Sequence, residues 1–123
     1  VYINEDIIIG KVESVTTDTS IVRLITDNQS KFSVRKSEGE EAIGLVNGKL
    51  GLSLELTLVP ATEKLFPGDI LVTSGRDPLI PEGFLVGSVD TMQNDSNEFF
   101  QSGILAISYD PDELAIVSVL LTR

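Results

Sequence analysis

The 123-residue sequence contains no cysteine and no histidine, and these two absences exclude many functions. Without cysteine the chain has no disulfide, no thiolate nucleophile and no zinc knuckle. Without histidine it lacks the commonest general base, so Ser-His-Asp, Cys-His and HExxH chemistries are excluded. Carboxylate chemistry, a hard-cation site or a role without catalysis remain, and the last is the default expectation.

Basic residues are scarce as well: nine Lys and Arg stand against 19 Asp and Glu, which gives a formal net charge of −10. Nucleic-acid binding needs clustered Lys and Arg, so no nucleic-acid partner is expected. No run approaches the ~18 apolar residues of a membrane span, and no signal-peptide pattern opens the chain. With 41% hydrophobic residues, the composition predicts one compact globular domain or two very small ones.

Alternation with a period of two predicts an all-β fold of short antiparallel strands with no substantial helix. The clearest strand runs from Leu52 to Leu58, where four leucines alternate with polar residues and are predicted to share one buried face. Strands at a spacing of roughly 8–14 residues indicate a barrel or a sandwich. The predicted strands are 8–15, 21–26, 31–36, 42–46, 52–58, 69–73, 85–92, 103–108 and 115–121.

Turn-forming residues separate the predicted strands. The segment 27–30 is predicted to be a hairpin loop, and Asn47-Gly48 is predicted to be the turn of a tight hairpin. Pro67-Gly68-Asp69 is typical of a turn that starts a strand. Segments 37–41 and 91–98 are predicted to be polar surface loops.

Two short patterns match catalytic motifs only in part. Ser33 and Lys36 have the S-x-x-K spacing of penicillin-binding enzymes, but that chemistry needs a helical turn. Their segment alternates as a strand, which places the two side chains on opposite faces. Asp18-Thr19-Ser20 is similar to the D-T-G of aspartic proteases, but Ser replaces Gly and no second copy exists, so an Asx-type turn is favoured.

Charged clusters give no specific site. Asp110 to Glu113, and Asp90 with Asp95 and Glu98, lack the spacing of an EF-hand and are interpreted as solvated loop carboxylates, not Ca²⁺ ligands. No catalytic, cofactor-binding or metal-binding residue is therefore predicted. A basic patch on two neighbouring strands is interpreted as a solvated sheet face or, alternatively, as a surface for an acidic partner: Arg23, Lys31, Arg35 and Lys36.

One region carries a more specific signature. Gly68-Asp69-Ile70-Leu71-Val72-Thr73-Ser74-Gly75 is followed by Pro81-Glu82-Gly83 and by Phe84-Leu85-Val86-Gly87-Ser88-Val89. This region resembles the rod shape-determining protein MreC family, with its G-D-x-V-x-T-S-G strand, Gly-rich loop ending in P-x-G, and P-V-G-x-V strand. The resemblance continues in order over 10–12, 22–27, 32–35, 44–48, 56–60 and 110–119.

The resemblance assigns structural roles to the signature residues Gly68, Asp69, Thr73, Ser74, Gly75, Pro81, Gly83 and Gly87. Gly75 and Gly83 are expected to have positive φ, which a Cβ disfavours. Ser74 is not expected to be catalytic, because no histidine can activate it. Two departures from the family pattern are Arg76-Asp77-Pro78, where the family has two glycines, and Ile107, where it tends to have proline.

The resemblance also implies an architecture and a function. Residues 1–123 would form one β domain, which is within the usual size of a domain. It would be built of small six-stranded-barrel-like units: two subunits that share strands, the central one covering about 30–108. Further strands, a coiled coil and a membrane span would precede Val1. The family implies a non-catalytic scaffold of the cell-wall elongation complex that maintains rod shape on the extracytoplasmic face of the cytoplasmic membrane. No cofactor is implied; the implied partners are penicillin-binding protein 2, MreD, RodA and, indirectly, the actin-like MreB.

Two other functions stay open from the residues alone: a carboxylate-dependent hydrolase and a generic β-barrel binding module. Two carboxylates ~5–9 Å apart in a deep cleft would favour the hydrolase, because glycosidases use that spacing. Self-association is expected as well: the family resemblance implies it, and an exposed sheet edge is expected near 7–15 or 115–121, where unpaired backbone groups recruit another strand.

Overall fold

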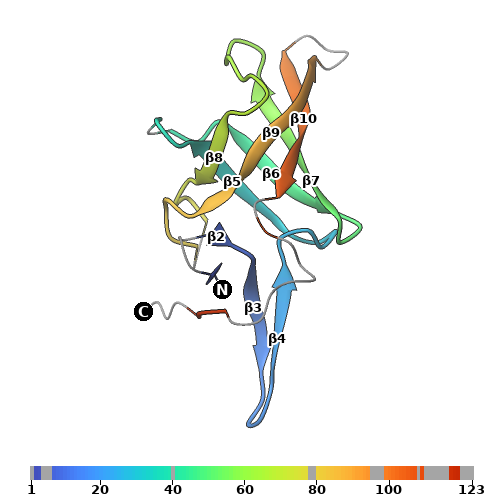
Figure 1. Ribbon diagram of the computed structural model, residues 1–123, viewed down its shortest axis with the longest axis vertical. Coiled ribbons are helices and arrows are strands. Elements are labelled where there is room, and N and C mark those ends of the chain that lie inside the picture. The colour runs from blue at the N-terminus through green and yellow to red at the C-terminus, as the bar shows by residue number, and fades with distance from the viewer. Residues whose placement is uncertain are drawn as a thin grey trace.

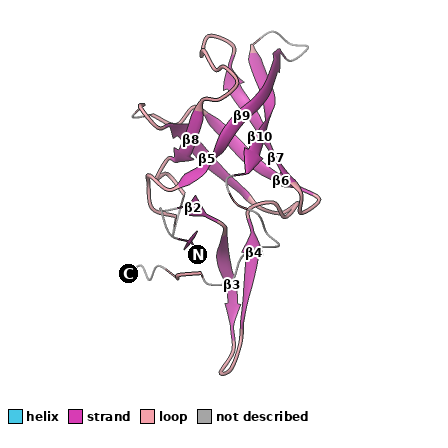
Figure 2. Cartoon of the chain, in the orientation of Figure 1, coloured by secondary structure: helices cyan, strands magenta, loops and turns pink. Residues whose placement is uncertain are grey.

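The computed structural model describes residues 2–3, 7–39, 41–77, 80–94, 99–107, 109 and 117–119. Every regular element in these residues is a β-strand, so the predicted all-β class is confirmed (Figure 2). Within the same residues no helix is long and apolar enough to cross a membrane. The strands are β1 (Tyr2–Ile3), β2 (Ile7–Ile8), β3 (Gly10–Val15), β4 (Ser20–Leu24), β5 (Lys31–Lys36), β6 (Gly44–Lys49), β7 (Ser53–Pro60), β8 (Ile70–Thr73), β9 (Leu85–Asn94) and β10 (Phe100–Ile107).

Six antiparallel strands close into a barrel. Their order is β9-β10-β7-β6-β5-β8, and β8 pairs back with β9. Closure leaves these six strands without a long free edge, which removes a template for unwanted pairing. The interior is apolar because inward positions carry aliphatic or aromatic side chains. The buried core consists of Ile8, Ile25, Phe32, Val34, Ile43, Val46, Leu54, Leu56, Val59, Leu65, Leu71, Val86, Val89 and Leu105.

A second, two-stranded sheet formed by β3 and β4 projects away from the barrel (Figure 1). Most of its side chains face solvent, and Val15 is 72% exposed. An isolated two-stranded hairpin is only marginally stable in water, so its base must be supported. That support includes a hydrogen bond from the Ile25 N–H to the Ile9 carbonyl oxygen, at 2.9 Å. The predicted strand 8–15 is thereby divided at Ile9: Ile8 ends β2 in the barrel sheet, and β3 begins at Gly10.

The prediction of one buried face for all four leucines of segment 52–58 was wrong for two of them. Leu54 and Leu56 are fully buried, whereas Leu52 is 77% exposed and Leu58 is 51% exposed. Leu58 has a φ of +57° and lies where the pairing of β7 with β10 shifts register. Such a β-bulge interrupts the alternation, so Leu58 turns outward and Val59 inward. Leu52 precedes β7 and belongs to the turn before it.

The predicted turn at Asn47-Gly48 was also wrong, because both residues lie inside β6. The chain turns instead at Leu50-Gly51. Gly48 is required by a close approach of two backbones: a Cβ there would lie 2.6 Å from the Asp27 nitrogen. The Gly48 N–H donates to the Ser30 carbonyl oxygen at 3.1 Å, which holds the 26–30 segment against the barrel.

The remaining turn predictions have mixed outcomes. Segment 27–30 is not a hairpin loop, because it joins β4 to β5, which belong to different sheets. Strand β9 continues to Asn94, so the predicted loop 91–98 begins too early. The turn at Pro67-Gly68-Asp69 is confirmed: Gly68 has a φ of +95°, and the Asp69 N–H donates to the Phe66 carbonyl oxygen at 3.0 Å. The acidic cluster 110–113 lies outside the described residues, as does most of the predicted strand 115–121.

Candidate functional site

The signature loop, residues 74–84, connects β8 to β9 and is closed at its base by Thr73. The fully buried Thr73 hydroxyl donates to the Pro81 carbonyl oxygen at 2.6 Å and accepts from the Phe84 N–H at 3.0 Å. The Gly83 N–H donates to the Thr73 carbonyl oxygen at 3.0 Å. One threonine therefore fixes the far end of the loop, which explains a hydroxyl at a position that is otherwise part of the core.

Positive φ angles at Gly75 and Gly83, +85° and +93°, confirm the backbone expectation for these two positions. Their surroundings differ, because a Cβ on Gly75 would lie 2.7 Å from the Cβ of Glu82, whereas a Cβ on Gly83 would meet open space. Gly75 is therefore constrained by both conformation and room, and Gly83 by conformation alone.

The other signature residues flank the loop. Gly68 and Asp69 form the turn before β8, where the Asp69 carboxylate accepts from the Phe66 N–H at 3.0 Å. The Val89 N–H donates to the Asp69 carbonyl oxygen at 2.8 Å, which ties this turn to β9. Gly87 is buried within β9. The signature thus occupies both ends of β8 and the start of β9, and it does not converge on one point.

A partly buried polar network fastens the loop to the barrel wall. The Asp77 Oδ2 accepts hydrogen bonds from the backbone N–H and the hydroxyl of Ser33 on β5, both at 2.9 Å. The Ser33 and Ser74 hydroxyls are hydrogen-bonded to each other, and the Arg76 N–H donates to the Ser74 Oγ at 3.2 Å. Asp77, one of the departures from the family pattern, is therefore an anchor of the loop. Its partner lies 44 positions earlier, so no local pattern could have identified it.

The predicted basic patch does not form, because its arginines are engaged elsewhere. Arg35 donates to the carbonyl oxygens of Lys36, Ser37 and Gly39, at 3.0, 3.3 and 2.8 Å. Its Nε lies 3.7 Å from the Glu82 Oε2 on the signature loop. Arg35 thus organises the loop after β5 and is not available as a free surface charge.

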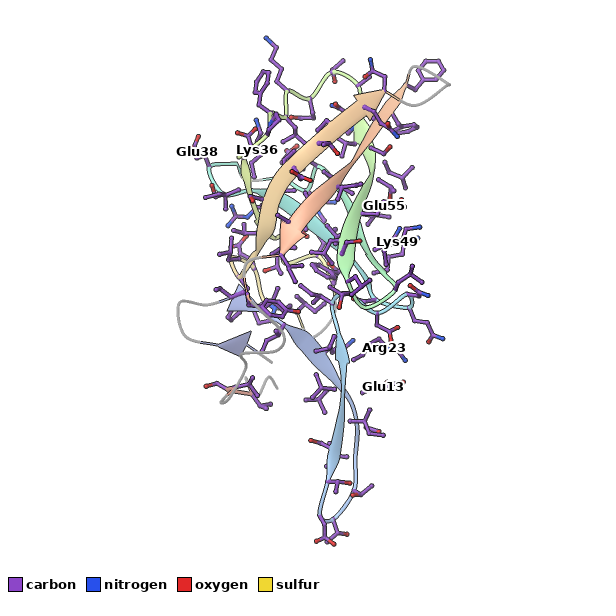
Figure 3. The ribbon with its side chains drawn as sticks, turned by 45° about the vertical axis from the view of Figure 1, so that its right-hand side comes forward. Glu13, Arg23, Lys36, Glu38, Lys49 and Glu55 are labelled. Atoms are coloured by element: carbon purple, nitrogen blue, oxygen red, sulfur yellow. The ribbon has the colours of Figure 1, made fainter. Side chains whose placement is uncertain are left out.

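Arg23 lies on β4, in the sheet that does not contain Lys31, Arg35 or Lys36. Its guanidinium bonds the Glu13 Oε1 at 2.5 Å and the Asp27 Oδ1 at 2.9 Å; Figure 3 labels the Arg23 and Glu13 pair on the hairpin. The pKa of Asp27 is lowered, mainly by the backbone N–H of Gln29, which donates to its carboxylate, and further by Arg23. The same two carboxylates raise the pKa of Arg23, with Glu13 the larger cause.

A groove of about 370 Å³ lies between the base of the β3–β4 hairpin, the start of β5 and the signature loop. Its volume falls in the range of ~300–1,000 Å³ that is typical of binding pockets. Asp77 and Ile80 contribute the loop's part of the wall, so the signature and the hairpin meet here. Sequence reasoning missed this groove because three separate segments build it. Within the described part of the chain no group of three or more His, Cys, Asp or Glu side chains could hold a metal ion.

Comparisons with known proteins agree with this architecture. The family model "Rod shape-determining protein MreC, barrel core" matches residues 1–121. The cell shape-determining protein MreC of Listeria monocytogenes is 30% identical over 120 residues, which cover 92% of this chain and 40% of that protein. The crystal structure of MreC from Pseudomonas aeruginosa is similar with a TM-score of 0.72 and 25% identity, covering 86% of this chain and 70% of that one.

A further solved structure, the complex between penicillin-binding protein PBP2 and MreC from Helicobacter pylori, has the same fold. It matches with a TM-score of 0.64 and 20% identity, covering 80% of this chain and 60% of the matched chain. The present chain therefore spans well under two thirds of the Listeria protein and somewhat less than two thirds of the Helicobacter chain.

Proposed function

The chain belongs to the MreC family of cell shape-determining proteins, and we propose that it is part of a non-catalytic scaffold of the bacterial cell-wall elongation complex. The observation that carries the proposal is the closed six-stranded barrel with the family's signature loop clamped onto it by Thr73. A rigid barrel that presents loops and a projecting hairpin is suited to holding partners in place.

The proposal of a non-catalytic role is supported by the surroundings of Ser74. Its hydroxyl is hydrogen-bonded to that of Ser33, and the whole sequence has no histidine to act as a base. A serine without a general base is a weak nucleophile at neutral pH. The nearby carboxylate of Asp77 is engaged by Ser33 as well, so both groups serve the loop's attachment.

A penicillin-binding protein is the partner we propose first. The Helicobacter protein of the same fold is seen in a complex with PBP2, which supports this choice. The family relationship further suggests MreD and RodA as partners, an indirect link to the actin-like MreB, and self-association. It also suggests that the protein acts on the extracytoplasmic face of the cytoplasmic membrane, with an anchor elsewhere in the longer protein.

Direct binding tests the partner. The extracytoplasmic part of PBP2 from a rod-shaped bacterium is immobilised, and the 123-residue chain is passed over it in a biosensor. We expect saturable binding with a Kd below about 100 µM. An acidic β-barrel protein of similar size serves as the control, and binding no stronger than that control would contradict the proposal.

Cell shape tests the scaffold role. The matched 120 residues of the Listeria protein are replaced by this chain, and the chimera is expressed in Listeria cells depleted of their own MreC. We expect rod shape to be restored, and the Ser74→Ala chimera to restore it equally. Round cells with a stably expressed chimera would argue against the proposed function. Loss of shape in the Ser74→Ala chimera alone would argue against the non-catalytic role.

A further inference from the structure

Two lysines at the groove between hairpin, β5 and signature loop have no ion-pair partner among the described residues. Lys11 on β3 and Lys31 on β5 both line the groove and are exposed. The salt bridges of the described chain involve Arg23, Arg35 and Lys49, but neither of these lysines. They are therefore two positive charges beside one groove in a protein whose formal net charge is −10.

The acidic side chains of the same groove are already engaged. Glu13 is paired with Arg23 at 2.5 Å, and Asp77 accepts two hydrogen bonds from Ser33. Asp77 keeps its negative charge, because Ser33 is a neutral donor. The lining still holds three cations, Lys11, Arg23 and Lys31, against the two carboxylates Glu13 and Asp77, so its formal net charge is 3 − 2 = +1. A negatively charged ligand would be attracted here although the protein as a whole repels it.

Apart from Gly10, Gln29 and Ser30, the remaining lining is apolar and comes from each of the segments that form the groove. Ile8 and Val12 come from the N-terminal strands, Ile25 and Phe32 from either side of the β4–β5 connection, and Ile80 from the signature loop. Ile8, Ile25 and Phe32 are themselves buried, so Val12 and Ile80, which are half-buried, are the apolar side chains that a ligand can still cover. A ligand that carries charge alone would leave these two uncovered. One that also carries aliphatic side chains would remove apolar surface from water, which is favourable.

We propose that this groove binds an extended peptide segment of a partner protein in which acidic and aliphatic residues alternate. In an extended strand successive side chains point to opposite sides, so one set can face the apolar lining while the other faces Lys11 and Lys31. This inference rests on the proposed function as a protein scaffold and adds the chemical class of its partner segment. An anionic polymer lacks the aliphatic component, and a flat anionic membrane cannot enter a groove.

The expected interaction is weak and salt-dependent. An exposed ion pair changes affinity by no more than about fivefold, so two lysines together account for up to about 25-fold. Salt at ~0.15 M screens such charges beyond ~8 Å, so affinity is expected to fall as ionic strength rises.

The experiment titrates the isotope-labelled 123-residue chain with three blocked hexapeptides, followed by amide NMR shifts. One peptide alternates valine and glutamate, one replaces glutamate by lysine, and one replaces valine by serine. The test variant is Lys11→Glu with Lys31→Glu. Its control, Lys36→Glu with Lys64→Glu, changes the net charge equally at lysines that do not line the groove.

The proposal expects the valine–glutamate peptide to shift amides around residues 11–13, 25 and 31–32. It expects at least a tenfold loss of affinity in the groove variant and less than a threefold loss in the control variant, since exposed pairs are worth up to about fivefold each. The proposal would be overturned if the valine–glutamate peptide shifted no amides, or if both variants lost affinity for it equally. It would also be overturned if the serine–glutamate peptide or phosphatidylglycerol vesicles bound as tightly as the valine–glutamate peptide. These results leave the PBP2 biosensor and cell-shape assays untouched, so a failure here is distinguishable from a failure of the scaffold role.

Discussion

The carboxylate of Asp77 holds Ser33 twice, through the backbone N–H and through the side-chain hydroxyl, although 44 positions separate the two residues. This contact joins the signature loop to the wall of the barrel. Since Ser33 is buried, its N–H has no ready replacement acceptor from solvent.

Asp77→Ala is expected to lower the free energy of unfolding by about 1–3 kcal/mol, the cost of leaving a buried donor unsatisfied. Asp77→Asn keeps an acceptor oxygen and should cost less. Urea denaturation followed by circular dichroism measures both. Asp90→Ala, at an exposed carboxylate on β9, is the control. An Asp77→Ala variant as stable as this control would show that the loop does not depend on the contact.

The two glycines of the signature loop predict an order of destabilisation. Gly83→Ala should cost about 1–2 kcal/mol, because alanine disfavours a left-handed backbone. Gly75→Ala should cost more, since its Cβ would also collide with the Cβ of Glu82. Thermal unfolding of both variants gives the comparison. The reverse order, or two equal losses, would mean that the loop shifts to make room at Gly75.

The leucines of segment 52–58 predict a contrast within one strand and its turn. Leu56→Ala removes a fully buried side chain and should cost about 2–5 kcal/mol. Leu52→Ala removes a side chain that is 77% exposed and should change stability by less than about 0.5 kcal/mol. Denaturant midpoints of the two variants decide the matter. A large loss at Leu52 would place that side chain in a contact that its exposure does not reveal.

These leucines also show what the sequence could and could not predict. Alternation correctly predicted a strand there, and an exact match was obtained for 31–36, because local periodicity is enough to identify a strand. The bulge at Leu58 was not predictable, since it depends on how β7 pairs with β10, about 45 residues later. The turn predicted at Asn47-Gly48 was wrong for a related reason: Gly48 allows the close approach of the backbone at 26–27 and does not form a turn.

The candidate site was harder to predict than the fold. The signature residues were identified as one stretch of sequence, and the positive φ of Gly75 and Gly83 followed from residue type. The groove needs β3, the start of β5 and the loop together, so no single segment carries its pattern. Arg23 was wrongly assigned to a basic patch. Its ion pair with Glu13 forms across a hairpin and depends on how β3 and β4 pair, which the order of residues along the chain does not reveal.

The environment of Asp27 predicts a loss of stability in acid. Its pKa is lowered from the ordinary value of 3.8, mainly by the Gln29 N–H and also by Arg23, so the folded state binds this proton less readily than the unfolded state. The stabilising contribution is therefore complete above about pH 4 and is lost as pH falls through the folded-state pKa.

Asp27→Asn should accordingly flatten the dependence of stability on pH below about 4, because the titrating group is gone. Denaturant unfolding of both proteins between pH 3 and pH 6, chosen to bracket the ordinary carboxyl range, measures the slope. A carboxyl ¹³C titration of Asp27 provides the site-specific check. A midpoint at or above the ordinary value of 3.8 would contradict the prediction.

The turn between β6 and β7 holds a leucine in a conformation that leucine disfavours. Leu50 and Gly51 have φ angles of +55° and +71°, and the Leu52 N–H donates to the Lys49 carbonyl oxygen at 2.9 Å. Positive φ at both central residues is the requirement of a type I′ turn, where asparagine followed by glycine is strongly preferred. The Leu50 side chain is 76% exposed, so its replacement sacrifices little burial.

Leu50→Asn is therefore expected to stabilise the chain by about 0.5–1 kcal/mol, since asparagine tolerates a left-handed backbone better than leucine does. The backbone bond from the Leu50 N–H to the Asn28 side-chain oxygen, at 2.6 Å, does not involve the replaced side chain and should persist. Leu52→Asn is the matched control, because Leu52 is equally exposed but has no positive φ. Thermal and urea unfolding should show a gain for the first variant only. A similar gain in both would assign the effect to a more polar surface, and a loss in Leu50→Asn would show that the exposed leucine makes contacts that outweigh its backbone strain.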